Sequence, residues 1–374
     1  MRYFDHNATS PLCVAARQAW LTAVERFPAN PSSPHRLGAR ADAALNDARQ
    51  SAAAWLGASP FDLVWTSGAT EAANAVMHHA AQAGDGEVWF SAIEHPCMIA
   101  AARRWFGPRV HPIPVTRDGV ADLNRLTDRL RLRRPALVAV MAANNETGVL
   151  QPWREALALC REHDVPFACD AAQWVGKLPA AGLGEADYVI GCAHKFGGPV
   201  GVGFMKVAAG FRPHLVGGPQ EDGRRAGTEN VPGVLAMTAA WAERERQMAA
   251  GNLDQRQVWR DHFVAELRAV LPETEIIGER MDRLWNTVAA LMPPVADCRR
   301  RWVVQLDKLG FAVSTGSACA SGKEQPSHVL VAMGCDPAKT DRMVRISAGW
   351  ETTEDDWQAL RVAIETAAGT LCRG

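Results

Sequence analysis

Two polar residues that follow short apolar runs have types and spacing that suit chemistry. Asp170 follows residues 165–169, and Lys195 lies a few residues beyond 188–190. Short apolar runs that end in polar residues and glycines are typical of buried parallel strands, whose ends bind ligands in open α/β sheets. A carboxylate on one strand end and a lysine beyond the next suit a pyridoxal phosphate (PLP) site. The lysine would hold the aldehyde as a Schiff base, and the carboxylate would keep the ring nitrogen protonated. Taken alone, this spacing fits a surface ion pair beside a glycine-rich turn better.

A turn of small residues could hold an anion. The sequence Thr-Ser-Gly-Ala-Thr-Glu at 66–71 follows a predicted strand at 61–65 and opens a predicted helix that runs to about residue 83. Free backbone N–H groups and the positive end of the helix dipole favour a phosphate there, assisted by the Thr70 hydroxyl. An ordinary helix cap is the commoner use of such a turn.

Three further polar residues lie on or after predicted strands. His95 follows 88–91 and could stack on a flat cofactor ring and move protons, or be a satisfied core histidine. Asn145 follows 137–141, and its amide could bond a cofactor oxygen or only stabilise the turn. Arg345 could clamp a substrate carboxylate bidentately, although an ordinary ion pair is the commoner role of an arginine.

Cys319 differs in its surroundings from the other eight cysteines. It lies among glycine, serine and alanine residues with Lys323 nearby. An exposed thiol near positive charge has more thiolate character and can act as a nucleophile. Four of the others lie in or beside apolar or helical sequence, where a cysteine packs as a small hydrophobe: Cys97, Cys160, Cys169 and Cys298.

These groups must be positioned by a chain of 374 residues that alternates predicted strands and helices up to about residue 251. A chain of this length can bury a large core and divide into two or three domains. We predict a large α/β domain over 15–252 and a smaller α+β domain formed by 1–14 and 253–374, which carries the Cys319 loop. The polar, glycine-rich stretch at 217–230 is long for a loop inside a compact domain, which is typical of a functional or disordered segment.

Composition excludes several classes of protein. A net charge of −1 gives no reason to expect nucleic acid or a membrane surface as a partner. Nine scattered cysteines without a CxxC pair fit reduced thiols better than disulfides or a metal site, so we predict no metal. The N-terminal residues are not those of a signal or transit peptide, and no apolar run approaches the roughly 20 residues that cross a bilayer. We therefore expect a soluble, cytoplasmic protein.

The order of the motifs is more specific than any one of them. The chain contains, in sequence, Asp-His-Asn-Ala-Thr (5–9), Asn-Pro-Ser-Ser (30–33), Thr-Ser-Gly-Ala-Thr-Glu (66–71), Glu-His (94–95), Asn-Asn-Glu-Thr-Gly (144–148), Asp-Ala-Ala-Gln (170–173), Ala-His-Lys (193–195), Gly-Gly-Pro-Gln-Glu (217–221), Arg-Ala-Gly-Thr-Glu-Asn (225–230), Ser-Thr-Gly-Ser-Ala-Cys (314–319) and Arg-Ile-Ser-Ala-Gly (345–349). This run, over nearly the whole chain, resembles the cysteine desulfurases of the NifS/IscS type within the class V aminotransferase group.

The resemblance implies an α/β protein of the PLP-dependent transferase fold type I, with a mainly parallel seven-stranded sheet in the large domain and a smaller α+β domain. It implies a homodimer that binds PLP. The residues implied in cofactor binding are Lys195 as the Schiff-base lysine, Asp170 at the ring nitrogen, Gln173 and Asn145 near the ring hydroxyl, His95 stacked on the ring, and Ala69, Thr70 and His194 at the phosphate. Thr228 would reach the phosphate bound by the other subunit.

The resemblance also implies a reaction. L-cysteine would bind with its carboxylate on Arg345, and Lys195 and His95 would shuttle protons. The Cys319 thiolate would attack the substrate sulfur and become a persulfide, alanine would be released, and the sulfur would pass to an acceptor in iron–sulfur cluster assembly or thiolation.

One residue departs from the family pattern. Cys192 stands where a hydroxyl residue usually bonds the phosphate, and a thiol is a weaker donor, so the phosphate would be held less well or differently. Two other functions stay open at this point. A selenocysteine lyase or another PLP-dependent C–S lyase would depend less on Cys319, and a non-catalytic scaffold would have no need of Lys195, His95 and Asp170.

Overall fold

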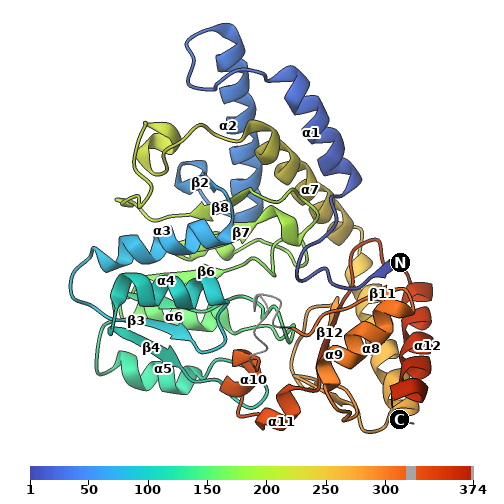
Figure 1. The fold of residues 1–374 in the computed structure, drawn as a ribbon. Coiled ribbons are helices and arrows are strands. Elements are labelled where there is room, and N and C mark those ends of the chain that lie inside the picture. The colour runs from blue at the N-terminus through green and yellow to red at the C-terminus, as the bar shows by residue number, and fades with distance from the viewer. Residues whose placement is uncertain (317–325, 372–374) are drawn as a thin grey trace.

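The computed structural model describes residues 1–316 and 326–371, and its centre is a seven-stranded sheet (Figure 1). The strand order is β2-β8-β7-β6-β5-β3-β4. Only β8 runs antiparallel to its two neighbours in this sheet, so the predicted, mainly parallel seven-stranded sheet is confirmed. The strands are β2 (Leu63–Thr66), β3 (Val88–Ser91), β4 (Val110–Ile113), β5 (Leu137–Ala139), β6 (Phe167–Asp170), β7 (Tyr188–Cys192) and β8 (Gly203–Lys206).

Helices cover both faces of this sheet because its central strands are apolar on both sides. Every residue of β6 and β7 is buried, as expected of parallel strands between two helical layers. One core cluster joins the sheet to α1 (Val14–Arg26), α2 (Arg36–Leu56), α5 (Leu123–Leu130), α6 (Trp153–Glu162) and α7 (Val231–Ala249). A second cluster on the other face joins it to α3 (Ala69–Ala81) and α4 (Pro96–Phe106).

A smaller antiparallel sheet follows, of order β12-β10-β9. Its own core cluster includes Phe263, Trp302 and Trp357 from the helices that cover it, and both chain ends lie beside this part of the molecule (Figure 1). The elements are α8 (Asn252–Val270), β9 (Glu275–Ile276), β10 (Thr287–Leu291), α9 (Cys298–Lys308), β11 (Phe311–Ala312), α10 (His328–Ala332), α11 (Pro337–Thr340), β12 (Met343–Ser347) and α12 (Glu354–Leu371). The division into domains at residue 252 stays a prediction.

The N-terminal segment connects the two sheets. Strand β1 (Arg2–Tyr3) pairs in parallel with β11, and the Ser347 N–H donates to the Phe4 carbonyl at 2.7 Å. A few residues later, the Ser10 N–H donates to the His194 carbonyl at 2.7 Å, beside the end of β7. Residues 4–10 therefore run from the small sheet to the strand ends of the large one.

Most predicted elements are present, with shifted bounds. The predicted strand at 61–65 begins as a 3-10 turn at Pro60–Asp62. Helix α1 is capped by Cys13, and helix α2 ends at Gly57, which has φ 71°. None of the helices in the described part of the chain has both the length and the apolar character needed to cross a bilayer.

Candidate active site

A cavity of about 420 Å³ opens at the carboxyl ends of β6 and β7. Asp170 ends β6, and Lys195 ends the short 3-10 turn Ala193–Lys195 that follows β7. The structure brings most of the predicted site residues to its walls, which include Ala69, Thr70, His95, Asn145, Asp170, Gln173, Cys192, His194 and Lys195. A larger hollow of about 670 Å³ between α8 and the 279–285 turn contains none of them.

The Lys195 amine is held by the N-terminal segment. Its Nζ donates to the carbonyl oxygens of Asn7 and Ala8, both at 2.8 Å. Two neutral acceptors orient the amine without forming an ion pair with it at these contacts. Asn7 and Ala8 belong to the first motif of the sequence, but no pattern in the sequence indicated that their carbonyls would meet this lysine.

Asp170 is a buried carboxylate with an exposed fraction of 4%. Its Oδ1 accepts from the Ala172 N–H at 2.9 Å. Burial raises the pKa of Asp170, and the Ala172 N–H and the Lys195 charge oppose that rise. A buried carboxylate is stabilised by a cation, and a protonated ring nitrogen in the cavity is a cation of the required kind.

The start of α3 offers an anion site on the cavity wall. Gly68 provides no side-chain cap for the helix, and a Cβ at Gly68 would meet no heavy atom within 4 Å, so the turn faces open space. A Cβ at Gly203 would lie 2.7 Å from the Gly68 Cα, so glycine lets β8 pass close behind this turn. The Cys192 thiol is hydrogen-bonded to the Ala69 N–H, and burial is the main cause that raises the pKa of Cys192 to about 11. The helix dipole and the backbone N–H groups here suit a phosphate.

His95 follows β3 and caps α4. Its Nδ1 accepts from the Cys97 backbone N–H at 3.2 Å, so the neutral ring carries its proton on Nε2. Burial is the main cause that lowers the pKa of His95 to about 4, followed by the charges of Lys195 and His328. At neutral pH the ring is therefore uncharged.

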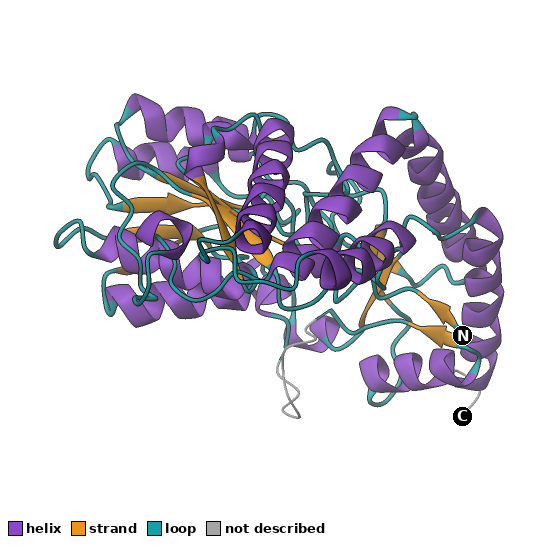
Figure 2. Cartoon of the chain, turned by 90° about the horizontal axis from the view of Figure 1, so that it is seen from above, coloured by secondary structure: helices purple, strands orange, loops and turns teal. Residues whose placement is uncertain are grey.

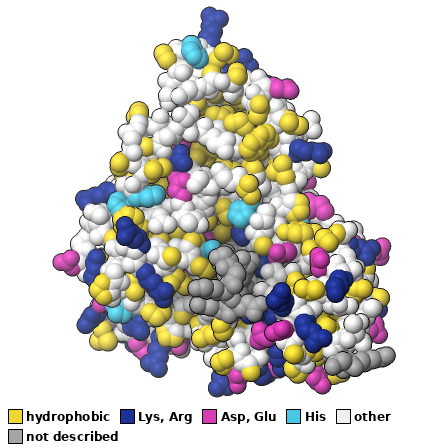
Figure 3. Space-filling model, viewed as in Figure 1, with side chains coloured by type: hydrophobic (Ala, Val, Ile, Leu, Met, Phe, Trp, Pro, Cys, Tyr) yellow, Lys and Arg dark blue, Asp and Glu magenta, His cyan; other side chains and the backbone are white. Residues whose placement is uncertain are grey.

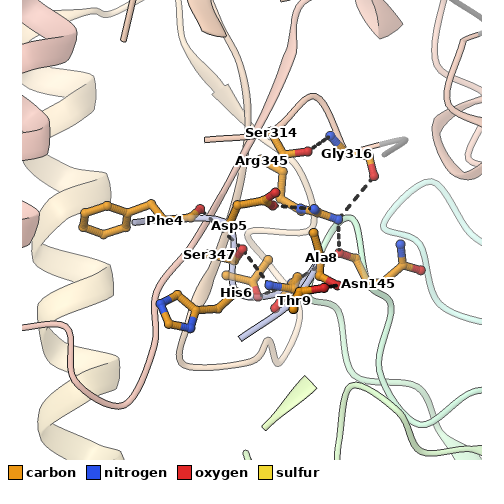
Figure 4. A network of polar contacts seen from close by, with 12 residues as sticks. Phe4, Asp5, His6, Ala8, Thr9, Asn145, Ser314, Gly316, Arg345 and Ser347 are labelled. Atoms are coloured by element: carbon orange, nitrogen blue, oxygen red, sulfur yellow. Dashed lines mark hydrogen bonds and ion pairs between the residues drawn. The ribbon is translucent and has the colours of Figure 1, made fainter. Parts of the chain in front are cut away.

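Arg345 does not line the cavity but lies against Asn145, which does (Figure 4). The guanidinium is buried, with 1% of the residue exposed, and its Nη2 is 2.7 Å from Asp5 Oδ1. Its Nη1 donates to the carbonyl oxygens of Asn145 at 3.0 Å and Gly316 at 3.2 Å. Asp5 was not predicted as a site residue, because its partner is 340 positions away in the chain.

The other two predicted residues are Thr228 and Cys319. Thr228 is in the 217–230 segment and is not among the residues that line the cavity of its own chain. Cys319 lies outside the described residues. Within the part of the chain that the structure describes, no group of three or more His, Cys, Asp or Glu side chains is placed to hold a metal ion.

Comparisons with known proteins agree on one family. The aminotransferase class-V family matches residues 2–360. A cysteine desulfurase of Klebsiella pneumoniae is 39% identical over 363 residues, which are 95% of this chain and 89% of that relative. Among solved structures, a NifS-like protein superposes with a TM-score of 0.90 at 29% identity, covering 99% of this chain and 100% of its own. A structure of SspA in complex with cysteine has a TM-score of 0.77 at 26% identity, covering 93% of this chain and 98% of its own.

Proposed function

The chain belongs to the aminotransferase class-V family, and from that premise we propose that it is a PLP-dependent cysteine desulfurase. It converts L-cysteine to L-alanine and transfers the sulfur first to Cys319 as a persulfide and then to an acceptor. The observation that carries the proposal is a single cavity that joins Lys195, Asp170 and the start of α3. The cysteine desulfurase relative and the cysteine-bound SspA structure support cysteine as the substrate.

The cavity fits PLP at three points. Lys195 would hold its aldehyde carbon, Asp170 would face its ring nitrogen, and the turn at Gly68 would receive its phosphate, together with Thr70 and His194. Gln173 and Asn145 would lie near the ring hydroxyl. The buried Asp170 carboxylate and the open, uncapped helix start are the features of this chain that such a cofactor complements. When bound, PLP supplies an electron sink for the negative charge that develops on the substrate carbon.

His95 and Lys195 would move the protons. Because its lowered pKa keeps His95 neutral at neutral pH and its Nδ1 already accepts a hydrogen bond, His95 can offer its Nε2–H group as a hydrogen-bond donor to negative charge that develops on the substrate. Lys195 is oriented by two carbonyl oxygens before cofactor or substrate arrives, so the amine is held near the Asp170 strand end.

Arg345 would take the substrate carboxylate. In the described structure its Nη2 is paired with Asp5, and its Nε has no hydrogen-bond partner among the described residues. A carboxylate that enters beside Asn145 would therefore meet a guanidinium that is already oriented.

In the proposed transfer of sulfur, the nucleophile is the thiolate of Cys319. The thiolate would attack the substrate sulfur, an S–S bond would form, and the C–S bond would break with its electron pair remaining on the substrate carbon. That carbon then takes a proton and leaves as the methyl group of alanine. The persulfide sulfur passes to an acceptor protein of iron–sulfur cluster assembly or thiolation.

A homodimer is supported by exposed apolar residues. Leu21 and Val24 on α1 are 61% and 51% exposed, and Val200 beside the cavity is 68% exposed. Figure 3 shows hydrophobic side chains gathered on the upper part of the molecule, over the helices that include α1 and α2. Apolar surface of this kind marks contact sites. In the dimer Thr228 would reach the partner's phosphate site.

The proposal is tested on purified protein supplied with L-cysteine and a reductant, by assaying alanine and sulfide. We expect a yellow protein that makes both, a Cys319→Ala variant that makes neither, and a Cys335→Ala variant, as a matched control away from the cavity, that makes both. Sulfide with pyruvate instead of alanine would identify a C–S lyase. Lyase activity on selenocysteine that survives Cys319→Ala would identify a selenocysteine lyase, and a colourless, inactive protein would indicate a scaffold.

A further inference from the structure

Lys177 is a buried lysine that the proposed chemistry does not use. It lies in the turns after β6, seven residues beyond Asp170, and only 3% of it is exposed. Lys177 does not line the cavity itself. It contacts Gln173, which does line the cavity. Burial lowers the pKa of Lys177 well below its ordinary value, and the charges of Lys195 and Arg345 lower it further.

The Lys177 amine donates hydrogen bonds to two side-chain oxygens. Its Nζ donates to Asn7 Oδ1 at 2.7 Å and makes a short hydrogen bond to Gln173 Oε1. A lysine nitrogen, charged or neutral, keeps at least two N–H groups, so it can serve both oxygens in either state. The Lys177 carbonyl accepts from the Trp285 indole at 2.9 Å, which fixes the backbone of this turn.

These contacts determine which way the Gln173 amide points. Its Oε1 faces Lys177, and its Nε2 donates to the Asn7 carbonyl at 2.9 Å. The Asn7 amide is fixed in turn, because its Nδ2 donates to Thr287 Oγ1 at 2.9 Å and to the Asn145 carbonyl at 3.2 Å. With its oxygen occupied and one N–H used, Gln173 retains one N–H group for the cavity that it lines.

We propose that Lys177 is a positioning residue, which holds the Gln173 amide so that it presents an N–H group, and not its oxygen, to the ring-hydroxyl oxygen of bound PLP. This inference rests on the proposed function, because it concerns the cofactor. An N–H donor at that oxygen favours the ionised form of the hydroxyl, whereas a carbonyl oxygen would favour the protonated form. An amine is costly to bury, and here it pairs with the amides of Gln173 and Asn7.

Two substitutions separate the roles of Lys177. Lys177→Met removes the donor and keeps the length of the side chain, so the Gln173 amide is free to turn. Lys177→Gln offers an amide N–H group without the charge. In the holoenzyme at neutral pH, we expect Lys177→Met to lower the ratio of ionised to protonated ring hydroxyl, read from the cofactor absorbance, and to weaken PLP binding by about tenfold. Compared with Lys177→Met, the Lys177→Gln variant should retain most of the ratio of ionised to protonated ring hydroxyl and most of the PLP affinity of the unaltered protein.

A double-mutant cycle tests whether the effect passes through Gln173. In a Gln173→Leu background, Lys177→Met should cause no further change in the absorbance ratio. Lys206→Met is the matched control, because Lys206 on β8 is a partly buried lysine whose Nζ donates to the Ala186 carbonyl at 2.7 Å, away from the cavity. It should leave the cofactor absorbance as in the unaltered protein.

The outcomes distinguish this inference from the proposed function. An unaltered protein that binds PLP, with a Lys177→Met variant of the same absorbance ratio and PLP affinity, would overturn the inference and leave the function standing. An effect of Lys177→Met that persists in the Gln173→Leu background would also overturn it. An unaltered protein that takes up no PLP would overturn both.

Discussion

At the scale of single residues, Cys192 lines the end of the cavity where we propose that the phosphate binds. Its thiol is 2% exposed and is hydrogen-bonded to the Ala69 N–H, one of the backbone groups at the start of α3. With its pKa raised to about 11, Cys192 stays protonated at neutral pH. The thiol therefore contributes no charge to the site and is a weaker donor than a hydroxyl group would be.

A serine at this position should bind the cofactor more tightly. We expect Cys192→Ser to lower the dissociation constant for PLP by up to about tenfold, the effect of one good hydrogen bond. The measurement is a titration of the protein with PLP, followed by absorbance. Cys335→Ser serves as the control, because Cys335 is partly buried and outside the cavity. Weaker binding by Cys192→Ser would show that the hydroxyl does not reach the phosphate.

Asp5 neutralises the buried Arg345 guanidinium. We expect Asp5→Asn to lower the free energy of unfolding by about 3 kcal/mol, because it leaves a buried charge without its partner. Chemical denaturation of the protein without substrate measures this. The matched control is Asp128→Asn, which breaks the exposed pair with Arg131 and should cost under about 1 kcal/mol. Equal losses in the two variants would contradict the role given to Asp5.

The residues that line the cavity could be predicted from the sequence, whereas the residues that hydrogen-bond to them and fix their positions could not. Lys195, Asp170 and His95 each follow an apolar strand, and this local signal is visible in the chain. Asn7 and Lys177 carry no such signal, because their partners are set by tertiary packing: the Lys195–Asn7 contact spans 188 positions and the Lys177–Asn7 contact 170. No local rule of spacing relates residues so far apart.

At the scale of elements, the Glu221–Arg49 ion pair helps to anchor the segment that carries Thr228, together with the Arg225–Glu71 ion pair. Glu221 is 6% exposed and has φ 51°. Its two carboxylate oxygens accept from Arg49 Nη1 and Nη2 of α2, both at 2.9 Å, and one of them also accepts from the Trp65 N–H of β2 at 2.9 Å. The 217–230 segment is thereby tied to a helix and to an edge strand of the large sheet.

Glu221→Gln should loosen this segment while the sheet remains folded. The amide keeps the shape of the side chain but loses the ion pair and leaves the partly buried Arg49 charge without its carboxylate. We expect trypsin to cleave at Arg224 and Arg225 several times faster than in the unaltered protein, with fragments identified by mass. Glu243→Gln, which removes an exposed pair with Arg246 on α7, is the control. An unchanged rate of cleavage would show that Glu221 does not anchor the segment.

Of the elements that were not predicted from the sequence, strand β4 has a weak pattern, whereas α5 has leucines at helical spacing after an Asp122 cap. Strand β4 is the edge strand Val-His-Pro-Ile and is mostly half-exposed, so it shows neither an apolar run nor alternation, and its proline is tolerated because it lies at the edge. Helices α4 and α5 on either side of it were missed as well. The antiparallel direction of β8 depends on how the chain returns to the sheet, and residues 203–206 do not encode it.

At the scale of the whole molecule, one buried and two partly buried histidines make stability depend on pH. Burial is the main cause that lowers the pKa of His6 to about 4, and the pKa values of His95 and His194 are lowered to about 4 in the same way. Between the ordinary value of 6.5 and about 4, the unfolded chain binds a proton at each of these residues and the folded chain does not. Their contribution to stability is complete above pH 6.5 and is lost as the pH falls toward 4.

His6 offers the cleanest test, because it lies outside the cofactor cavity. We expect the free energy of unfolding to fall as the pH is lowered from 6.5 to 4, and His6→Gln to reduce that slope by up to about 1.4 kcal/mol per pH unit. Denaturation of the protein without cofactor at several pH values measures it. His262→Gln, on an exposed position of α8, is the control. A slope that His6→Gln leaves unchanged would contradict the buried, neutral state of His6.

Because residues 4–10 connect the two sheets, they also affect the order in which parts of the protein can fold during synthesis. These residues leave the ribosome early, yet Asp5 cannot meet Arg345 until 340 further positions of chain have been synthesised. Until then the carbonyls of Asn7 and Ala8 lack the surroundings that hold them against Lys195, although the strands of the large sheet are already available to fold. A nascent chain can thus build the large sheet before it can complete the contacts that hold the Lys195 amine.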